Sequence, residues 1–102
     1  MSAITDHDVI LVYEQLKDRY DLSLTTTTAF DKDFTIDCPL IVGQAHGQII
    51  ELYAYEGMFI LDVLNRDHTR GTHWHPYEIA DAVRDIREFM EGRSNYKMLP
   101  LG

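Results

Sequence analysis

Two apolar runs separated by Glu56 and Gly57 constrain the fold of this chain more than any other part of its sequence. Residues 48–64 read QIIELYAYEGMFILDVL, and both runs are rich in the β-branched and aromatic residues that favour strands. Gly57 can adopt the positive φ that a two-residue hairpin turn requires. If the turn consists of those two residues, Tyr55 pairs with Met58 and the rest of the ladder follows in register. The segment therefore predicts an antiparallel β-hairpin.

Side chains alternate between the faces of a sheet, so this hairpin has two different surfaces. One surface is wholly apolar and is predicted to face the core: Ile50, Leu52, Ala54, Phe59, Leu61 and Val63. The other combines apolar and aromatic side chains with two opposed carboxylates: Ile49, Glu51, Tyr53, Tyr55, Met58, Ile60, Asp62 and Leu64. We call this second surface the open face, and it is where the sequence predicts a function.

One helix is predicted before the strands and another after them, because apolar residues recur there at helical spacing. Thr5 is the expected N-cap of the first helix, which should end near Tyr20. Pro76 suits the first position of the second helix, with His75 as its cap and Gly92 as its stop. The solvent side of that helix is predicted to carry charged residues: Arg84, Asp85, Arg87, Glu88 and Glu91.

The segment between the first helix and the hairpin is predicted to be extended. Residues 22–30 contain four consecutive β-branched threonines, and residues 34–36 and 40–45 have the composition of strands. Pro39 cannot donate to a ladder, so its section belongs at an edge or between strands. Gly43 indicates a bulge or the close approach of another group.

The order of these elements predicts an α+β domain. It comprises an N-terminal helix, an antiparallel meander of three to four strands and a C-terminal helix, with both helices on the apolar face of the sheet. A chain of 102 residues fits a single domain, residues 1–102. Residues 65–72 are predicted to form a polar connection, and residues 93–102 a C-terminal tail.

The charge balance indicates which partners suit this chain. Its 17 acidic and 9 basic residues give a formal charge of −8. Binding to a phosphate backbone usually needs a basic stripe, and no Lys/Arg cluster supplies one, so no nucleic-acid partner is expected. An acidic domain is repelled by anionic membranes and attracts basic proteins.

Cys38 is the single cysteine and cannot form an intramolecular disulfide. We expect a structural thiol in a reducing compartment, because no activating base adjoins it. The first residues lack the basic and apolar regions of a signal peptide, and no apolar run has the length of a membrane span. The sequence therefore predicts a cytoplasmic protein.

Histidines near the second helix are the first candidate for chemistry: His68, His73 and His75, with Asp67 nearby. In extended geometry His73 and His75 point to the same side, and Trp74 points inward. Such a pair can hold a divalent metal such as zinc, with Asp62 or Glu51 completing the site. The alternative is structural: His75 ends a helix and His73 hydrogen-bonds to a loop carbonyl.

Glu51 and Asp62 are the second candidate, because they lie directly opposite each other on the predicted ladder. Like charges in this position destabilise a sheet. A bound cation, a raised pKa of one carboxyl group or an Arg or Lys reaching across would relieve the conflict. The alternative is that both carboxylates are solvated. Their pairing depends on the register of the turn.

The third candidate is the apolar and aromatic part of the open face: Tyr53, Tyr55, Met58 and Ile60. Exposed aromatic residues with Met are typical of protein-binding surfaces. The alternatives are coverage of this patch by residues 22–30, by the tail or by a second copy. The chain has no Gly-rich phosphate loop, no G-x-S-x-G and no Cys–His pairing at useful spacing, which favours a non-enzymatic role.

Three sequence runs resemble a set of small bacterial proteins that have no established biochemical role: ELYAYEGMFILDV, GTHWHP and the helix ending in FMEG. The acidic single domain with an ELY-type strand also resembles immunity proteins that neutralise polymorphic bacterial toxins. That resemblance implies a non-enzymatic protein that binds a toxin through an acidic and aromatic surface.

The leading hypothesis is therefore a protein-binding module that engages another protein, or a second copy of itself, through the open face. Its predicted contact residues are Glu51, Tyr53, Tyr55, Met58, Ile60 and Asp62. The rival hypothesis is a metal-binding protein or metalloenzyme that uses His73 and His75.

Overall fold

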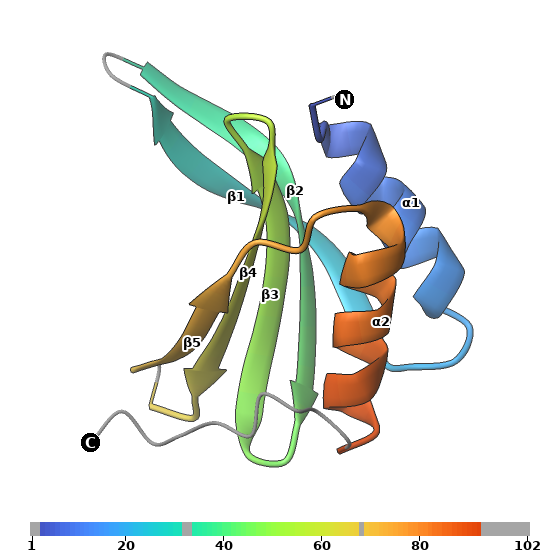
Figure 1. Ribbon diagram of the computed structural model, residues 1–102. Helices are drawn as coiled ribbons and strands as arrows, with labels where there is room; N and C mark the ends of the chain where they lie inside the picture. The colour runs from blue at the N-terminus through green and yellow to red at the C-terminus, as the bar shows by residue number, and fades with distance from the viewer. Residues whose placement is uncertain (1–2, 32–33, 68, 93–102) are drawn as a thin grey trace.

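A computed structural model describes residues 3–31, 34–67 and 69–92 of the chain. Its elements follow in the order α1 (Asp6–Leu16), β1 (Leu22–Asp31), β2 (Phe34–Ala45), β3 (Gln48–Tyr55), β4 (Met58–Asn65), β5 (Arg70–Trp74) and α2 (Ile79–Met90). The strands form one antiparallel sheet in the order β1-β2-β3-β4-β5 (Figure 1). The predicted α+β fold is confirmed, with five strands in the meander rather than three or four.

Two-residue turns set the register of the central strands. Glu56 and Gly57 have positive φ, 52° and 77°, as the type I′ turn of a two-residue hairpin requires. The predicted pairing of β3 with β4 therefore holds over the whole ladder. His46 and Gly47 make an equivalent turn between β2 and β3, with φ of 57° and 76°.

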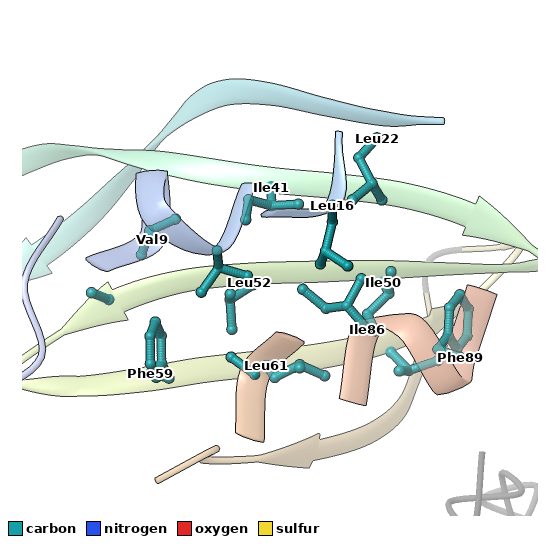
Figure 2. Packing of buried hydrophobic residues seen from close by; sticks show 14 residues of the cluster. Val9, Leu16, Leu22, Ile41, Ile50, Leu52, Phe59, Leu61, Ile86 and Phe89 are labelled. Carbon is teal, nitrogen blue, oxygen red and sulfur yellow. The ribbon is translucent and has the colours of Figure 1, made fainter. Parts of the chain in front are cut away.

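Both helices lie on one side of the sheet and cover its apolar face (Figure 1). The surface of the hairpin that was predicted to face the core does so, and all six of its side chains are buried. The helices pack against it through Val9, Leu16, Ile86 and Phe89 (Figure 2). Val12 and Ala82 belong to the same buried cluster. Full burial of one such large apolar side chain contributes roughly 1.5–3 kcal/mol, so this layer holds the fold together.

β2 is one long strand that runs through Pro39, where the sequence predicts two shorter strands. Pro39 pairs with Thr26 of β1, and the pairing of β2 with β3 begins at Ile41. The proline thus lies in a part of β2 that is paired on the β1 side, as a residue without an N–H donor allows. The register is regular across Gly43, so the bulge predicted there is wrong. The close approach is confirmed, since a Cβ on Gly43 would lie 2.6 Å from Cδ2 of Leu22.

The prediction that residues 65–72 form only a connection is wrong, because Arg70–Trp74 form β5. The polar residues before it make a tight reversal. The N–H of Asn65 donates to the carbonyl of Thr69 at 2.8 Å, and the N–H of Thr69 donates to the carboxylate of Asp67 at 3.1 Å. In a short strand of mostly polar residues, the alternation of apolar and polar side chains cannot be recognised, which explains the error.

α1 begins where the sequence predicts and ends earlier. The N–H of Thr5 donates to the carboxylate of Asp8 at 2.9 Å, which satisfies the start of the helix. The helix ends at Leu16, one turn before Tyr20. The predicted tail, residues 93–102, lies outside the described residues.

α2 begins later than predicted. Its N-cap is Glu78, whose N–H donates to the carboxylate of Asp81 at 3.1 Å. His75 is therefore not the cap, and Pro76 precedes the helix rather than occupying its first position. An acid three residues after the cap stabilises the start of this helix and outweighs the proline signal. Gly92, with φ of 74°, follows the end of the helix as predicted.

Candidate functional site

The open face lies on the side of the sheet away from both helices (Figure 1). The strand registers align one row of its side chains across four strands: Val42, Glu51, Asp62 and His73. The histidine comes from β5, so the strand that the sequence analysis missed extends the surface that it predicted. Two acids and an imidazole thus stand side by side on this face.

Exposure differs among the predicted contact residues of the open face. Met58 is 44% exposed, whereas Ile60 is 7% exposed. The two tyrosines and the two acids are half-buried. Ile60 is therefore mainly a packing residue opposite Tyr53, and the accessible surface comes from Met58, the tyrosines and the acids.

His73 lies against one of the two opposed carboxylates of the open face. Glu51 and Asp62 pair across β3 and β4, as predicted. Nδ1 of His73 lies 2.5 Å from Oδ1 of Asp62, and the two side chains are 35% and 17% exposed. With Nδ1 protonated, the imidazole donates to this carboxylate. The partner of Asp62 that the structure describes is thus a histidine.

His73 and His75 point to the same side of the chain, as predicted. Their rings are perpendicular, with centroids 4.8 Å apart. Nδ1 of His75 lies 2.9 Å from the carbonyl oxygen of Phe59, to which it donates as the Nδ1–H tautomer. This bond connects the chain that follows β5 to β4.

In the described part of the chain, these two histidines do not form a complete metal site. Within residues 3–31, 34–67 and 69–92, no group of three or more His, Cys, Asp or Glu side chains is placed to hold a metal ion. Nδ1 of each ring already contacts a protein oxygen, so only the two Nε2 atoms could act as ligands. His68 lies outside the described residues, and Asp67 accepts hydrogen bonds from Thr69.

Trp74 points to the opposite side, as predicted. There it contacts Asp85, a buried acid that was predicted to lie on the solvent side of the second helix. Asp85 of α2 is 2% exposed. Its carboxylate accepts a hydrogen bond from Nε1 of Trp74 at 3.0 Å and two from Arg84, each at 3.3 Å. Asp85 follows the buried Ala82 by three residues and precedes the buried Phe89 by four, and this helical spacing was the available signal for its burial.

Cys38 is 3% exposed. Burial raises the pKa of its thiol, and the nearby carboxylates of Asp6 and Asp37 raise it further. Because the thiolate is the nucleophilic form, a thiol with a raised pKa is less reactive at neutral pH. This environment fits the structural role expected for the residue.

Two cavities lie outside the aromatic part of the open face. One, of about 380 Å³, lies at the turn between β2 and β3 and is lined by Gln44, Gln48 and Arg66 among others. The other, of about 500 Å³, lies between the start of α1 and the segment before α2, next to Tyr77. Neither Tyr53 nor Tyr55 is among the described residues that line them.

The chain is thus an α+β protein whose sheet carries two helices on one face and an acidic, aromatic surface on the other. Comparisons with protein-family models, with curated proteins and with solved structures find no match. The resemblance to small bacterial proteins and to immunity proteins therefore stays a prediction. In the part of the chain that the structure describes, no helix is long and apolar enough to cross a membrane.

Proposed function

We propose that this protein is a non-enzymatic binding module that engages a basic protein through the open face. The observation that carries the proposal is the position of this face. It combines Tyr53, Tyr55 and the exposed Met58 with Glu51 and Asp62, and neither helix lies on it.

The side chains of the open face suit a protein ligand. Aromatic residues and Met are enriched at protein interfaces, where they give a large contact area and adapt to the shape of a partner. The carboxylates of Glu51 and Asp62 can accept hydrogen bonds from Arg or Lys side chains at the same surface. A formal charge of −8 also accelerates the encounter with a basic protein.

In its most specific form, the proposal is that this protein neutralises a toxin, as immunity proteins do. Such a role requires an accessible, preformed surface and no catalytic group. The raised pKa of the buried Cys38 thiol supports a role in which this residue is not a nucleophile.

The proposal can be tested by affinity capture with two matched variants. Met58→Lys places a positive charge in the open face, whereas Tyr77→Lys changes a residue that is 69% exposed and lies before α2. We expect a basic protein to be captured by the wild type and by Tyr77→Lys, and to be lost with Met58→Lys. The melting temperature of each variant controls for unfolding.

Purified binary complexes then give the dissociation constant of each variant. We expect Met58→Lys to weaken binding at least tenfold, which corresponds to 1.4 kcal/mol. Capture that is equal for the two variants, or a captured partner that is not basic, would contradict the proposal.

A further inference from the structure

β1 forms one edge of the sheet and pairs with β2 on one side. It is ten residues long, and its register runs without irregularity from Leu22 opposite Gly43 to Asp31 opposite Phe34. A regular edge strand presents a row of backbone N–H and C=O groups that can pair with another strand. The outer edge of β1 is therefore a preformed surface for strand addition.

The other edge of the sheet shows how such a surface is normally protected. β5 is five residues long, and its pairing with β4 is interrupted by an irregularity between Val63 and Leu64. Short length, bulges and charged residues are the usual devices that prevent edge-to-edge association. From Leu22 to Ala29, β1 has no Pro, no Gly and no charged residue. The edge at β5 therefore carries two of these protective features, and the stretch from Leu22 to Ala29 of β1 carries none.

The side chains of β1 favour pairing with a further strand. Ser23, Thr25, Thr26 and Thr28 are exposed, and threonine is favoured in strands and in cross-strand pairs. Leu24 is 38% exposed although it lies opposite Ile41, which belongs to the core. A strand added beside β1 would cover part of this apolar surface.

We infer that the partner of this edge is β1 of a second copy, paired antiparallel so that the two sheets become continuous. A two-fold axis perpendicular to the sheet brings the threonine run of one copy against the same run of the other, an isologous contact. Two copies with a formal charge of −8 each repel one another, and the uncharged stretch from Leu22 to Ala29 is where they approach at least electrostatic cost. This interface is independent of the open face.

The association state of the full chain tests the inference. By light scattering and sedimentation we expect a mass of twice 11.8 kDa at high concentration, with reversible dissociation on dilution. Thr26→Lys adds an edge charge and should give a monomer. Gln44→Lys, at an exposed position of β2, adds the same charge away from the edge and should leave the dimer intact. Far-ultraviolet circular dichroism establishes that both variants are folded.

Single cysteines at positions 25, 26 and 27 give a second measurement that does not depend on the lysine variant. They are introduced into a Cys38→Ala chain, because Cys38 lies opposite Thr27 in the β1–β2 ladder and could otherwise form a disulfide within one copy. Near a two-fold axis, a residue lies opposite its own copy at a distance that a disulfide can span. Under mild oxidation we expect at least one of Thr25→Cys, Thr26→Cys and Thr27→Cys to form a covalent dimer, and Gln44→Cys to form none. A wild-type chain that stays monomeric at every concentration, with no cross-link from the three cysteines, would overturn the inference. So would a dimer that Met58→Lys abolishes and Thr26→Lys does not.

Discussion

The buried carboxylate of Asp85 connects α2 to β5 through a hydrogen bond with Trp74. It is 2% exposed and receives the indole N–H of Trp74 at 3.0 Å. The guanidinium of Arg84 supplies two further donors at 3.3 Å. A buried charge needs such partners, because leaving it unpaired would cost several kcal/mol.

Replacing Asp85 by Ala should lower the free energy of unfolding by about 1–3 kcal/mol, since the indole N–H of Trp74 would lose its acceptor. Asp85→Asn keeps a side-chain oxygen for this bond and should lose less. Urea denaturation followed by the fluorescence of Trp74, the single tryptophan, measures both values. Equal losses in the two variants would show that the charge, and not the hydrogen bond, carries the effect.

Added Zn²⁺ should leave the melting temperature of the protein unchanged. Only the Nε2 atoms of His73 and His75 could bind the metal, because each Nδ1 contacts a protein oxygen, and within the described ranges no third ligand completes a site. The control is the double variant His73→Ala/His75→Ala, tested with and without the metal. Stabilisation of the wild type by zinc that this variant lacks would restore the metal-binding hypothesis.

Individual elements differ in how far the sequence determines them. The β3–β4 hairpin could be predicted in register because its turn depends on local chemistry, at Glu56 and Gly57. β5 could not, because its polar residues become a strand only when β4 and Trp74 position them. The prediction based on Pro76 places the start of α2 too early, because the cap formed by Glu78 and Asp81 is the stronger local signal.

Gly43 allows neighbouring side chains to pack closely against β2, because it has no Cβ. A Cβ at this position would lie 2.6 Å from Cδ2 of Leu22, 3.2 Å from Sδ of Met90 and 3.3 Å from Cγ2 of Ile50. Gly43→Ala should therefore lower the free energy of unfolding by about 1–3 kcal/mol through overpacking. Chemical denaturation gives the value.

A double variant distinguishes crowding at Gly43 from a backbone effect. Leu22→Ala removes the nearest atom, so Gly43→Ala/Leu22→Ala should be less destabilised than the sum of the single variants. Strict additivity would show that contact with Leu22 is not the cause.

The molecule has two proposed interaction surfaces, the open face and the outer edge of β1. Salt should affect binding at these two surfaces in opposite directions. Raising the salt concentration from about 0.1 M to about 1 M shortens the Debye length from about 10 Å to about 3 Å. Attraction between the acidic open face and a basic protein should weaken. Pairing of two copies through β1 should strengthen, because their mutual repulsion is screened.

Titration of each complex at the two salt concentrations measures these trends. Tighter binding of the basic partner at high salt would contradict an electrostatic role for Glu51 and Asp62. Dissociation of the dimer at high salt would contradict an interface formed by the uncharged part of β1.

The candidate site was predictable where it depends on alternation along one hairpin. The sequence placed Glu51, Asp62 and the two tyrosines on one face, and the register confirms that placement. It could not show that Ile60 is buried, since exposure depends on neighbours from distant segments. Nor could it bring His73 against Asp62, because that contact requires a strand the sequence does not reveal.

The position of both helices on one side of the sheet has a consequence for recognition. A dimer joined at β1 about an axis perpendicular to the sheet would present both open faces in the same direction (Figure 1). A ligand with two suitably spaced basic segments could then occupy both halves at once. The second contact would form within an existing complex, and such bivalency can raise the overall affinity by 10²–10⁴ without any additional type of interaction.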